Sequence, residues 1–175
     1  VGETGWFRHP KQFAAIEKEI FARLEHQYGG TKLRFWCAGC GSGQEAYSLA
    51  MGASKTLVSP PTRFSVLGTD ISAQAIATAK KATWSAEEIE PLPPKMRRRH
   101  FAKQEEAFAL NPATRRLCKF EVHNLMSDTY PQSFHLILCR NVLIYFSPAC
   151  RKHVLTKLAS VLKPGGFLVL GYSES

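Results

Sequence analysis

The alternation of strand-like and helix-like segments restricts the fold of this chain more than any other feature of its sequence. Short apolar runs, which are typical of buried strands, occupy residues 32–38, 63–72, 133–141 and 167–171. Segments with apolar residues at helical spacing lie between them, at residues 44–57, 72–83 and 147–162. This order predicts a mainly parallel, doubly wound α/β sheet with helices on both faces. A length of 175 residues predicts one domain, residues 1–175.

Three further features refine this prediction. Residues 10–28 have apolar side chains at helical spacing and predict a leading helix before the first strand. Two β-like runs, residues 99–110 and 115–124, lie on either side of the sequence NPAT and predict a small β-hairpin insertion at roughly residues 95–123. The sequence KPGG, residues 163–166, predicts a stop between the last helix and the last strand. Ser72 and Ser147 are expected to cap helices.

Composition limits the partners and the compartment. The 23 Lys and Arg residues against 14 Asp and Glu residues give a net charge of +9, which favours an acidic partner such as a nucleic acid, an anionic membrane or an acidic protein. Five cysteines, an odd number, indicate reduced thiols and therefore the cytoplasm. No apolar run is long enough for membrane insertion. No leader follows Val1, so we expect the chain to begin inside a longer protein.

A glycine-rich turn joins the first strand-like run to a helix within residues 34–51, RFWCAGCGSGQEAYSLAM. Ligands of doubly wound sheets bind at the carboxyl ends of the strands, so this turn is expected to form part of a binding site. Its glycines would let the backbone approach a ligand closely; they are Gly39, Gly41 and Gly43. Asp70 ends the second strand, where an acid can accept hydrogen bonds from both ribose hydroxyls. We predict a nucleoside ligand; a purely structural turn, with Asp70 in a capping role, is the alternative.

Glu45 decides between the possible nucleoside ligands. The spacing G-x-G-x-G differs from the dinucleotide pattern G-x-G-x-x-G, and a carboxylate at the start of the helix repels pyrophosphate and attracts a cation. S-adenosylmethionine contains adenosine without phosphate and carries a sulfonium and an ammonium. We therefore predict S-adenosylmethionine as the cofactor and S-adenosylhomocysteine as its product.

Cys37 and Cys40 have the C-x-x-C spacing of redox and zinc sites. Zinc needs four ligands, and the sequence has no second such pair. Cys37 also falls inside a predicted strand, so two small buried residues are the better interpretation. The six histidines have no ligand spacing, and we expect no metal.

Residues 136–148, LILCRNVLIYFSP, carry a family resemblance. They resemble the R-N-V-x-I-Y-F segment of the CheR family, the chemotaxis-receptor glutamate methyltransferases. Other segments resemble the family in the same order over nearly the whole chain: residues 4–8, 36–51, 68–72, 123–126 and 162–175. The resemblance implies a Rossmann-like sheet of a methyltransferase dependent on S-adenosylmethionine, and methylation of glutamate side-chain carboxylates on chemotaxis receptors.

The resemblance also implies the residues of the site. Those expected to contact the cofactor are Thr4, Arg8, Ala38, Gly39, Glu45, Asp70, Asn124, Leu125, Arg140 and Asn141. Arg8 and Tyr145 are expected to be catalytic and to lie beside the transferred methyl group. A glutamate substrate is ionised at pH 7, so methyl transfer to it needs no general base. Arg8 could hold the carboxylate and Tyr145 could hydrogen-bond its second oxygen, although a solvated arginine and a half-buried aromatic residue are the simpler alternatives.

Members of this family also carry an N-terminal helical domain and C-terminal antiparallel edge strands, and we expect both to be absent here. The last strand would then have an edge that a partner chain could cover. The basic run at residues 95–100 would dock an acidic helix of a chemoreceptor or a similar protein, or be a solvated surface. The alternatives in function are a nucleic-acid methyltransferase, which the net charge suggests but no target-base motif supports, and a non-catalytic regulatory module that binds S-adenosylmethionine.

Overall fold

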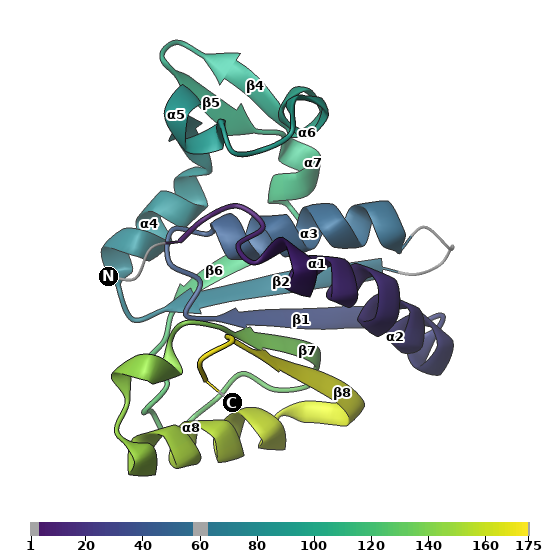
Figure 1. Cartoon of the computed structure of the whole chain (residues 1–175), viewed down its shortest axis with the longest axis vertical. Coiled ribbons are helices and arrows are strands. Elements are labelled where there is room, and N and C mark those ends of the chain that lie inside the picture. The colour runs from purple at the N-terminus through teal and green to yellow at the C-terminus, as the bar shows by residue number, and fades with distance from the viewer. Residues whose placement is uncertain (1–3, 58–62, 175) are drawn as a thin grey trace.

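The structure, a computed structural model, describes residues 4–57 and 63–174, and its centre is a parallel sheet (Figure 1). The sheet contains β1 (Lys32–Ala38), β2 (Arg63–Asp70), β6 (Cys118–Val122), β7 (Phe134–Cys139) and β8 (Leu162–Leu170). Its five strands lie in the order β6-β2-β1-β7-β8, and every pair is parallel. The chain therefore starts in the middle, moves to one edge and returns to the other. This confirms the doubly wound α/β fold and places its switch point between β1 and β7.

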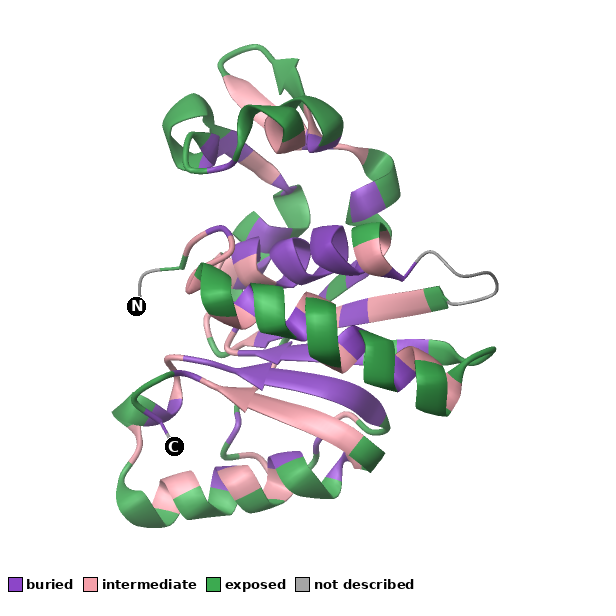
Figure 2. Cartoon of the chain, turned by 45° about the vertical axis from the view of Figure 1, so that its right-hand side comes forward, coloured by how far each residue is buried: buried purple, intermediate pink, exposed green. Residues whose placement is uncertain are grey.

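Helices cover both faces of the sheet (Figures 1 and 2). The first face carries α1 (Pro10–Ala15), the π-helical turn η1 (Ile16–Ile20), α2 (Phe21–Tyr28), α3 (Gln44–Thr56) and α4 (Ala73–Lys81). The second face carries α8 (Pro148–Ser160). The alternation along β1 divides the core, because Phe35 belongs to the first apolar cluster and Trp36 to the second, and both are fully buried.

Local sequence signals explain where several helices begin and end. The predicted leading helix spans residues 10–28, as α1, η1 and α2 follow one another without a break. The hydroxyl of Ser72 accepts a hydrogen bond from Ala75 N at 3.2 Å and caps α4. The hydroxyl of Ser147 accepts one from Cys150 N at 3.3 Å and caps α8, which has Pro148 in its first turn. Both predicted caps are confirmed.

A second, antiparallel sheet lies beyond α3 and α4, at the top of Figure 1. It contains β3 (Thr83–Ser85), β4 (Phe101–Gln104) and β5 (Ala107–Leu110) in the order β3-β5-β4. Three short helices accompany it: α5 (Ala86–Ile89), α6 (Pro94–His100) and α7 (Pro112–Arg115). Trp6 joins this unit to the amino-terminal segment, since its ring lies 4.9 Å from Trp84 and 5.4 Å from Phe101 in edge-to-face contacts.

The predicted pairing of the runs at residues 99–110 and 115–124 is wrong. Strands β4 and β5 both lie within the first run and pair with each other across a turn at residues 105–106. The second run contains β6, which pairs with β2 in the central sheet. The NPAT sequence forms α7 because Asn111 Oδ1 accepts a hydrogen bond from Thr114 N at 2.8 Å and Pro112 stands in the first turn.

Helix α8 ends at Ser160, before the predicted stop at KPGG, but the separation of KPGG from the last strand is wrong, because these residues belong to β8. Gly165 has a φ of 72°, and the β7–β8 register shifts between Phe134 and Leu136. The sequence therefore produces an irregularity within the strand, not a loop before it. Within the described residues β8 pairs with β7 alone, and coverage of its other edge by a partner chain stays a prediction. No helix in the described ranges is long and apolar enough to cross a membrane.

Candidate functional site

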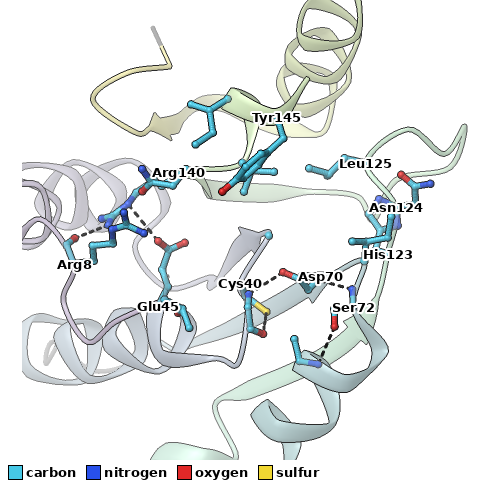
Figure 3. A pocket seen from close by; sticks show the side chains of 18 of the residues that line it. Arg8, Cys40, Glu45, Asp70, Ser72, His123, Asn124, Leu125, Arg140 and Tyr145 are labelled. Carbon is cyan, nitrogen blue, oxygen red and sulfur yellow. Dashed lines mark hydrogen bonds and ion pairs between the residues drawn. The ribbon is translucent and has the colours of Figure 1, made fainter. Parts of the chain in front are cut away.

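A cavity of about 520 Å³ opens at the carboxyl ends of the strands, beside the switch point (Figure 3). It brings together segments that are far apart in the sequence: the amino-terminal segment, the β1–α3 turn, the end of β2, residues 123–125 and residues 140–146. The predicted site residues among its lining are Thr4, Arg8, Gly39, Glu45, Asp70, Asn124, Leu125, Arg140, Asn141 and Tyr145. Ala38 is fully buried in the second apolar cluster and does not appear in this lining.

The glycine turn after β1 is shaped mainly by the protein itself. Gly39 has a φ of 79°, and a Cβ there would overlap the side chain of Val142. Gly43 has a φ of 97°, and a Cβ there would lie 2.8 Å from Ala79 Cβ. Gly39 and Gly41 line the cavity, as expected of glycines that let a ligand approach the backbone. Gly43 does not line it. The turn is tight because helices and loops pack against it.

Asp70 has a structural role in addition to its place in the cavity wall. Its Oδ2 accepts a hydrogen bond from Gly41 N at 2.9 Å, and its Oδ1 accepts one from Ser72 N at 2.9 Å (Figure 3). The carboxylate therefore joins the β1–α3 turn to the start of α4. Each oxygen keeps further acceptor capacity toward the cavity, because a carboxylate oxygen can accept two hydrogen bonds. Asp70 thus has a turn role, since Ser72 is the cap of α4, and this role is compatible with a ribose contact.

Glu45 and Arg140 form an ion pair at the other end of the cavity. Arg140 Nε lies 3.3 Å from Glu45 Oε2, and the Arg140 side chain is fully buried. The Arg140 guanidinium also donates a hydrogen bond to the carbonyl oxygen of Arg8 and lies 5.0 Å from the centre of the Phe13 ring. Three elements therefore fix its position: the amino-terminal segment, α1 and α3.

This ion pair leaves buried polar atoms unsatisfied. Glu45 Oε1, Arg140 Nη1 and Arg140 Nε are buried and have no hydrogen-bond partner, since the contact of Nε with Glu45 is an ion pair without hydrogen-bond geometry. Burial raises the pKa of Glu45 to about 7, although Arg140 and Arg8 oppose the shift. Buried polar atoms without partners are costly in a folded protein, so a pair of opposite charge at the wall of a cavity indicates a ligand that supplies the missing partners.

The backbone around Arg8 is held in an unusual conformation. Phe7 and His9, which flank Arg8, have φ values of 46° and 59°. Phe7 N donates a hydrogen bond to Ser48 Oγ of α3 at 3.0 Å, and Gln12 Nε2 donates one to the carbonyl oxygen of Leu170 at 2.8 Å. The left-handed conformation is rare for residues other than glycine and persists only where the surroundings enforce it. These contacts place Arg8 in the cavity wall, half-buried beside Glu45 and Arg140 (Figure 3).

Tyr145 ends the short 3-10 helix η2 (Leu143–Tyr145) and lies at the mouth of the cavity. Its side chain is 69% exposed, and Figure 3 shows its hydroxyl directed toward the side on which Arg140 lies. Two other apolar residues of the lining, Ile71 and Ile144, are 68% and 44% exposed. Large exposed apolar side chains beside a cavity mark a surface that a ligand or substrate can cover.

Sequence reasoning missed two residues of this region. His123 lines the cavity, its Nε2 is buried without a partner, and burial lowers its pKa. Glu174 is buried and its carboxylate accepts hydrogen bonds from four main-chain N–H groups. Neither residue stands in a spacing that indicates such a role, because both depend on contacts between distant segments.

The cysteines do not form a reactive pair or a metal site. Cys37 and Cys40 are free, buried thiols, and burial raises the pKa of each well above its ordinary value. A buried thiol with a raised pKa is a poor nucleophile and a poor ligand. Among residues 4–57 and 63–174, no group of three or more His, Cys, Asp and Glu side chains could hold a metal ion.

Comparisons with known proteins identify the family of this chain. The sequence profile described as "CheR methyltransferase, SAM binding domain" matches residues 2–175. The chain belongs to this CheR family. Its relatives include a chemotaxis protein methyltransferase of Listeria monocytogenes, 33% identical over 99% of this chain and 65% of the relative, and chemotaxis protein methyltransferase 1 of Pseudomonas aeruginosa, 35% identical over 100% and 66%. The chain thus spans about 65% of the length of the relatives that it matches.

Solved structures confirm the fold of the CheR domain. The carbon methyltransferase DszA superposes with a TM-score of 0.59 at 18% identity, covering 92% of this chain and 35% of that one. The CMeT domain of the citrinin polyketide synthase gives 0.56 at 20% identity, covering 91% and 34%. These similarities support the predicted Rossmann-like methyltransferase sheet, and the family assignment supports S-adenosylmethionine as the cofactor.

Proposed function

We propose that the cavity binds S-adenosylmethionine and that the protein transfers its methyl group to glutamate side-chain carboxylates of a chemotaxis receptor. The observation that carries this proposal is the buried ion pair with unsatisfied atoms on both partners, among them Glu45 Oε1 and Arg140 Nη1, which lie outside the Nε–Oε2 contact. The methionine part of the cofactor has an ammonium and a carboxylate, which are the complementary partners for these two atoms. A phosphate-bearing cofactor would bring its anion toward Glu45 and is disfavoured.

The other end of the cavity suits the adenosine part. Asp70 would accept hydrogen bonds from ribose hydroxyls while it keeps its two main-chain bonds. Ile71 and Leu125 supply apolar surface for the adenine ring, and Asn124 supplies an amide close to it. The proposed cofactor residues are therefore those expected from the sequence, except Ala38, which is buried in the second apolar cluster and does not line the cavity.

Methyl transfer itself would depend on orientation. The bound cofactor supplies an electrophilic methyl group, and an ionised glutamate attacks it without a general base. Arg8 would hold the substrate carboxylate, and Tyr145 would donate a hydrogen bond to its second oxygen or line the path of the methyl group. Exposed apolar residues at the mouth, Ile71 and Ile144, would exclude water once the substrate docks.

The proposed partner is an acidic helical region of a chemoreceptor. Relatives are named chemotaxis protein methyltransferases, and the net charge of +9 favours an acidic surface. Helix α6 exposes Lys95, Arg98 and Arg99, which we propose as a docking surface. His100 does not belong to it, because this residue is buried with its Nδ1 3.1 Å from Thr114 Oγ1. Localisation in the cytoplasm stays a prediction.

The proposal is tested with labelled S-adenosylmethionine, purified receptor protein and RNA. We expect label to enter the receptor as an alkali-labile ester. Arg8→Ala and Tyr145→Phe should slow transfer about 10- to 100-fold while changing the affinity for S-adenosylhomocysteine much less. Lys152→Ala, an exposed cation on α8, is the matched control and should transfer at the wild-type rate.

Three outcomes would contradict parts of this proposal. Label in RNA, with salt-dependent binding, would indicate a nucleic-acid methyltransferase. Cofactor binding without transfer to any substrate would indicate a regulatory module. Unchanged turnover in Arg8→Ala or Tyr145→Phe would remove that residue from the catalytic site.

A further inference from the structure

Glu174 lies outside the lining of the cavity, yet it makes more main-chain hydrogen bonds than any residue discussed above. Its Oε1 accepts from Val142 N and Leu143 N, both at 2.6 Å. Its Oε2 accepts from Asn141 N at 2.7 Å and from Gly171 N at 2.8 Å. The side chain is buried, with 2% of the residue exposed. A buried carboxylate that accepts several N–H bonds is satisfied without a cationic partner.

The segment that Glu174 holds is the turn after β7, and this turn forms one wall of the cavity. Asn141 has a φ of 60°, so the turn contains a strained residue at its start. Arg140 immediately precedes this residue, and Tyr145 ends the 3-10 helix that follows it. Glu174 therefore fixes the one stretch of backbone from which both side chains reach the cavity.

Close packing around the Glu174 carboxylate leaves little space for another position of this side chain. A Cβ at Gly171 would overlap Glu174 Oε2 and lie 3.1 Å from Asn141 N. The same part of the chain also contacts the segment that carries Arg8: the His9 and Tyr172 rings lie 4.7 Å apart. Gly171 and Glu174 are thus packed between the two segments that supply Arg8 and Arg140.

We propose that Glu174 is a positioning residue for methyl transfer: its carboxylate holds the strained turn at residues 141–143, and so sets the direction of Arg140 toward the cofactor and of Tyr145 toward the substrate. This inference rests on the proposed function. It requires both carboxylate oxygens to be acceptors. The amide of glutamine has nearly the same shape, but its NH2 group would face main-chain N–H donors and lose the bonds on that side.

Glu174→Gln tests the proposal in the full chain. We expect kcat for methyl transfer to fall about 10- to 100-fold, because a small displacement of positioning groups has effects of this size. Leu24→Ala, which truncates a buried side chain of α2 in the first apolar cluster, is the control for lowered stability. Glu106→Gln, in the exposed turn between β4 and β5, is the control for lost charge. Both should transfer methyl at nearly the wild-type rate at a temperature where all variants are folded.

Two further measurements separate positioning from general stability. In Glu174→Ala, added acetate should occupy the emptied carboxylate site and restore turnover in a saturable way, whereas acetamide should not and wild type should not respond. In Glu174→Gln, the amide protons of residues 141–143 should exchange faster with solvent than in Leu24→Ala at equal melting temperature.

The outcomes also separate this inference from the proposed function. Unchanged turnover in Glu174→Gln, or unchanged exchange of the amides at residues 141–143, would overturn the role of Glu174 and leave the proposed function intact. If wild type transferred no methyl group to receptors, the proposed function would fail. In that case faster amide exchange in Glu174→Gln, together with weaker binding of S-adenosylhomocysteine, would still support the positioning of Arg140.

Discussion

The two ends of the cavity differ in how their polar groups are satisfied. At one end Asp70 uses both oxygens to bind main-chain N–H groups, and its neighbours Ile71 and Leu125 are apolar. At the other end Glu45 and Arg140 are buried together, and each keeps a polar atom without a partner. At the first end the carboxylate is satisfied, although Nε2 of the neighbouring His123 has no partner, and this end offers apolar surface and spare acceptors to a flat ligand. At the second end both charged groups keep atoms that a charged ligand could satisfy.

This difference indicates that the Glu45 end of the cavity lowers the stability of the folded protein. The raised pKa of Glu45, about 7 against an ordinary value of 4.5, means that the folded protein holds this proton more tightly than the unfolded chain does. Its contribution to stability therefore falls as the pH rises from 4.5 through 7. Buried charged groups with unsatisfied atoms gain most from a ligand of complementary charge, so the Glu45 end should discriminate between ligands more strongly than the Asp70 end.

The largest expected effect separates the two ends directly. Glu45→Gln should weaken the binding of S-adenosylhomocysteine roughly 10- to 100-fold, because a charge-assisted hydrogen bond to the ammonium is lost. Binding of adenosine, which has no amino-acid part, should not change. Calorimetry with both ligands measures this, with Glu19→Gln on the exposed side of the leading helix as a control. An equal loss of affinity for both ligands would place Glu45 at the nucleoside end.

A smaller effect is expected from pH. Because burial raises the pKa of Glu45 to about 7, and a nearby ammonium favours its ionised form, the affinity for S-adenosylhomocysteine should fall as the pH drops below 7. The expected decrease between pH 8 and pH 6 is about tenfold. Titrations in wild type and in Glu45→Gln measure it, and a slope that persists in the variant would assign the proton to another group.

The smallest effect is expected at the Asp70 end of the cavity. Asp70→Asn keeps one acceptor oxygen but turns an NH2 group toward Gly41 N or Ser72 N. We expect about fivefold weaker binding, equal for adenosine and S-adenosylhomocysteine, and a lower melting temperature. The same two titrations and a thermal unfolding experiment provide the measurement. A loss confined to S-adenosylhomocysteine would contradict the division of the cavity into two ends.

The sequence predicted the central elements well because their signals are local. Periodicity located β1 at residues 32–38, and N-caps located the starts of α4 and α8. The errors occurred where a local signal had two solutions. The run at residues 115–124 has the pattern of a strand in either sheet, and only the packing of Cys118 and Phe120 into the main core decides which strand it joins.

In the candidate site, too, some features could be predicted from local sequence and others depend on contacts between distant segments. A carboxylate just after the glycine turn indicated a cationic ligand, and the resemblance to a family supplied Arg140 as a cofactor residue. The ion pair between Glu45 and Arg140, its unsatisfied atoms and its contact with the carbonyl of Arg8 could not be predicted, since they join three distant segments. Glu174 lies in a segment that resembles the family, but its role could not be predicted, because its hydrogen bonds are all to main-chain groups.

By itself the sequence determined the order of strands and helices, the sheet that they form and the charge at the start of α3, because hydrophobic periodicity, caps and residue type act over a few neighbouring positions. The tertiary structure alone decided that β6 lies in the main sheet and that two opposite charges are buried side by side. It also decided that the turn after β7 is held by a carboxylate from the segment that follows β8. These features depend on which distant groups share a space without water, where an unpaired polar atom is costly.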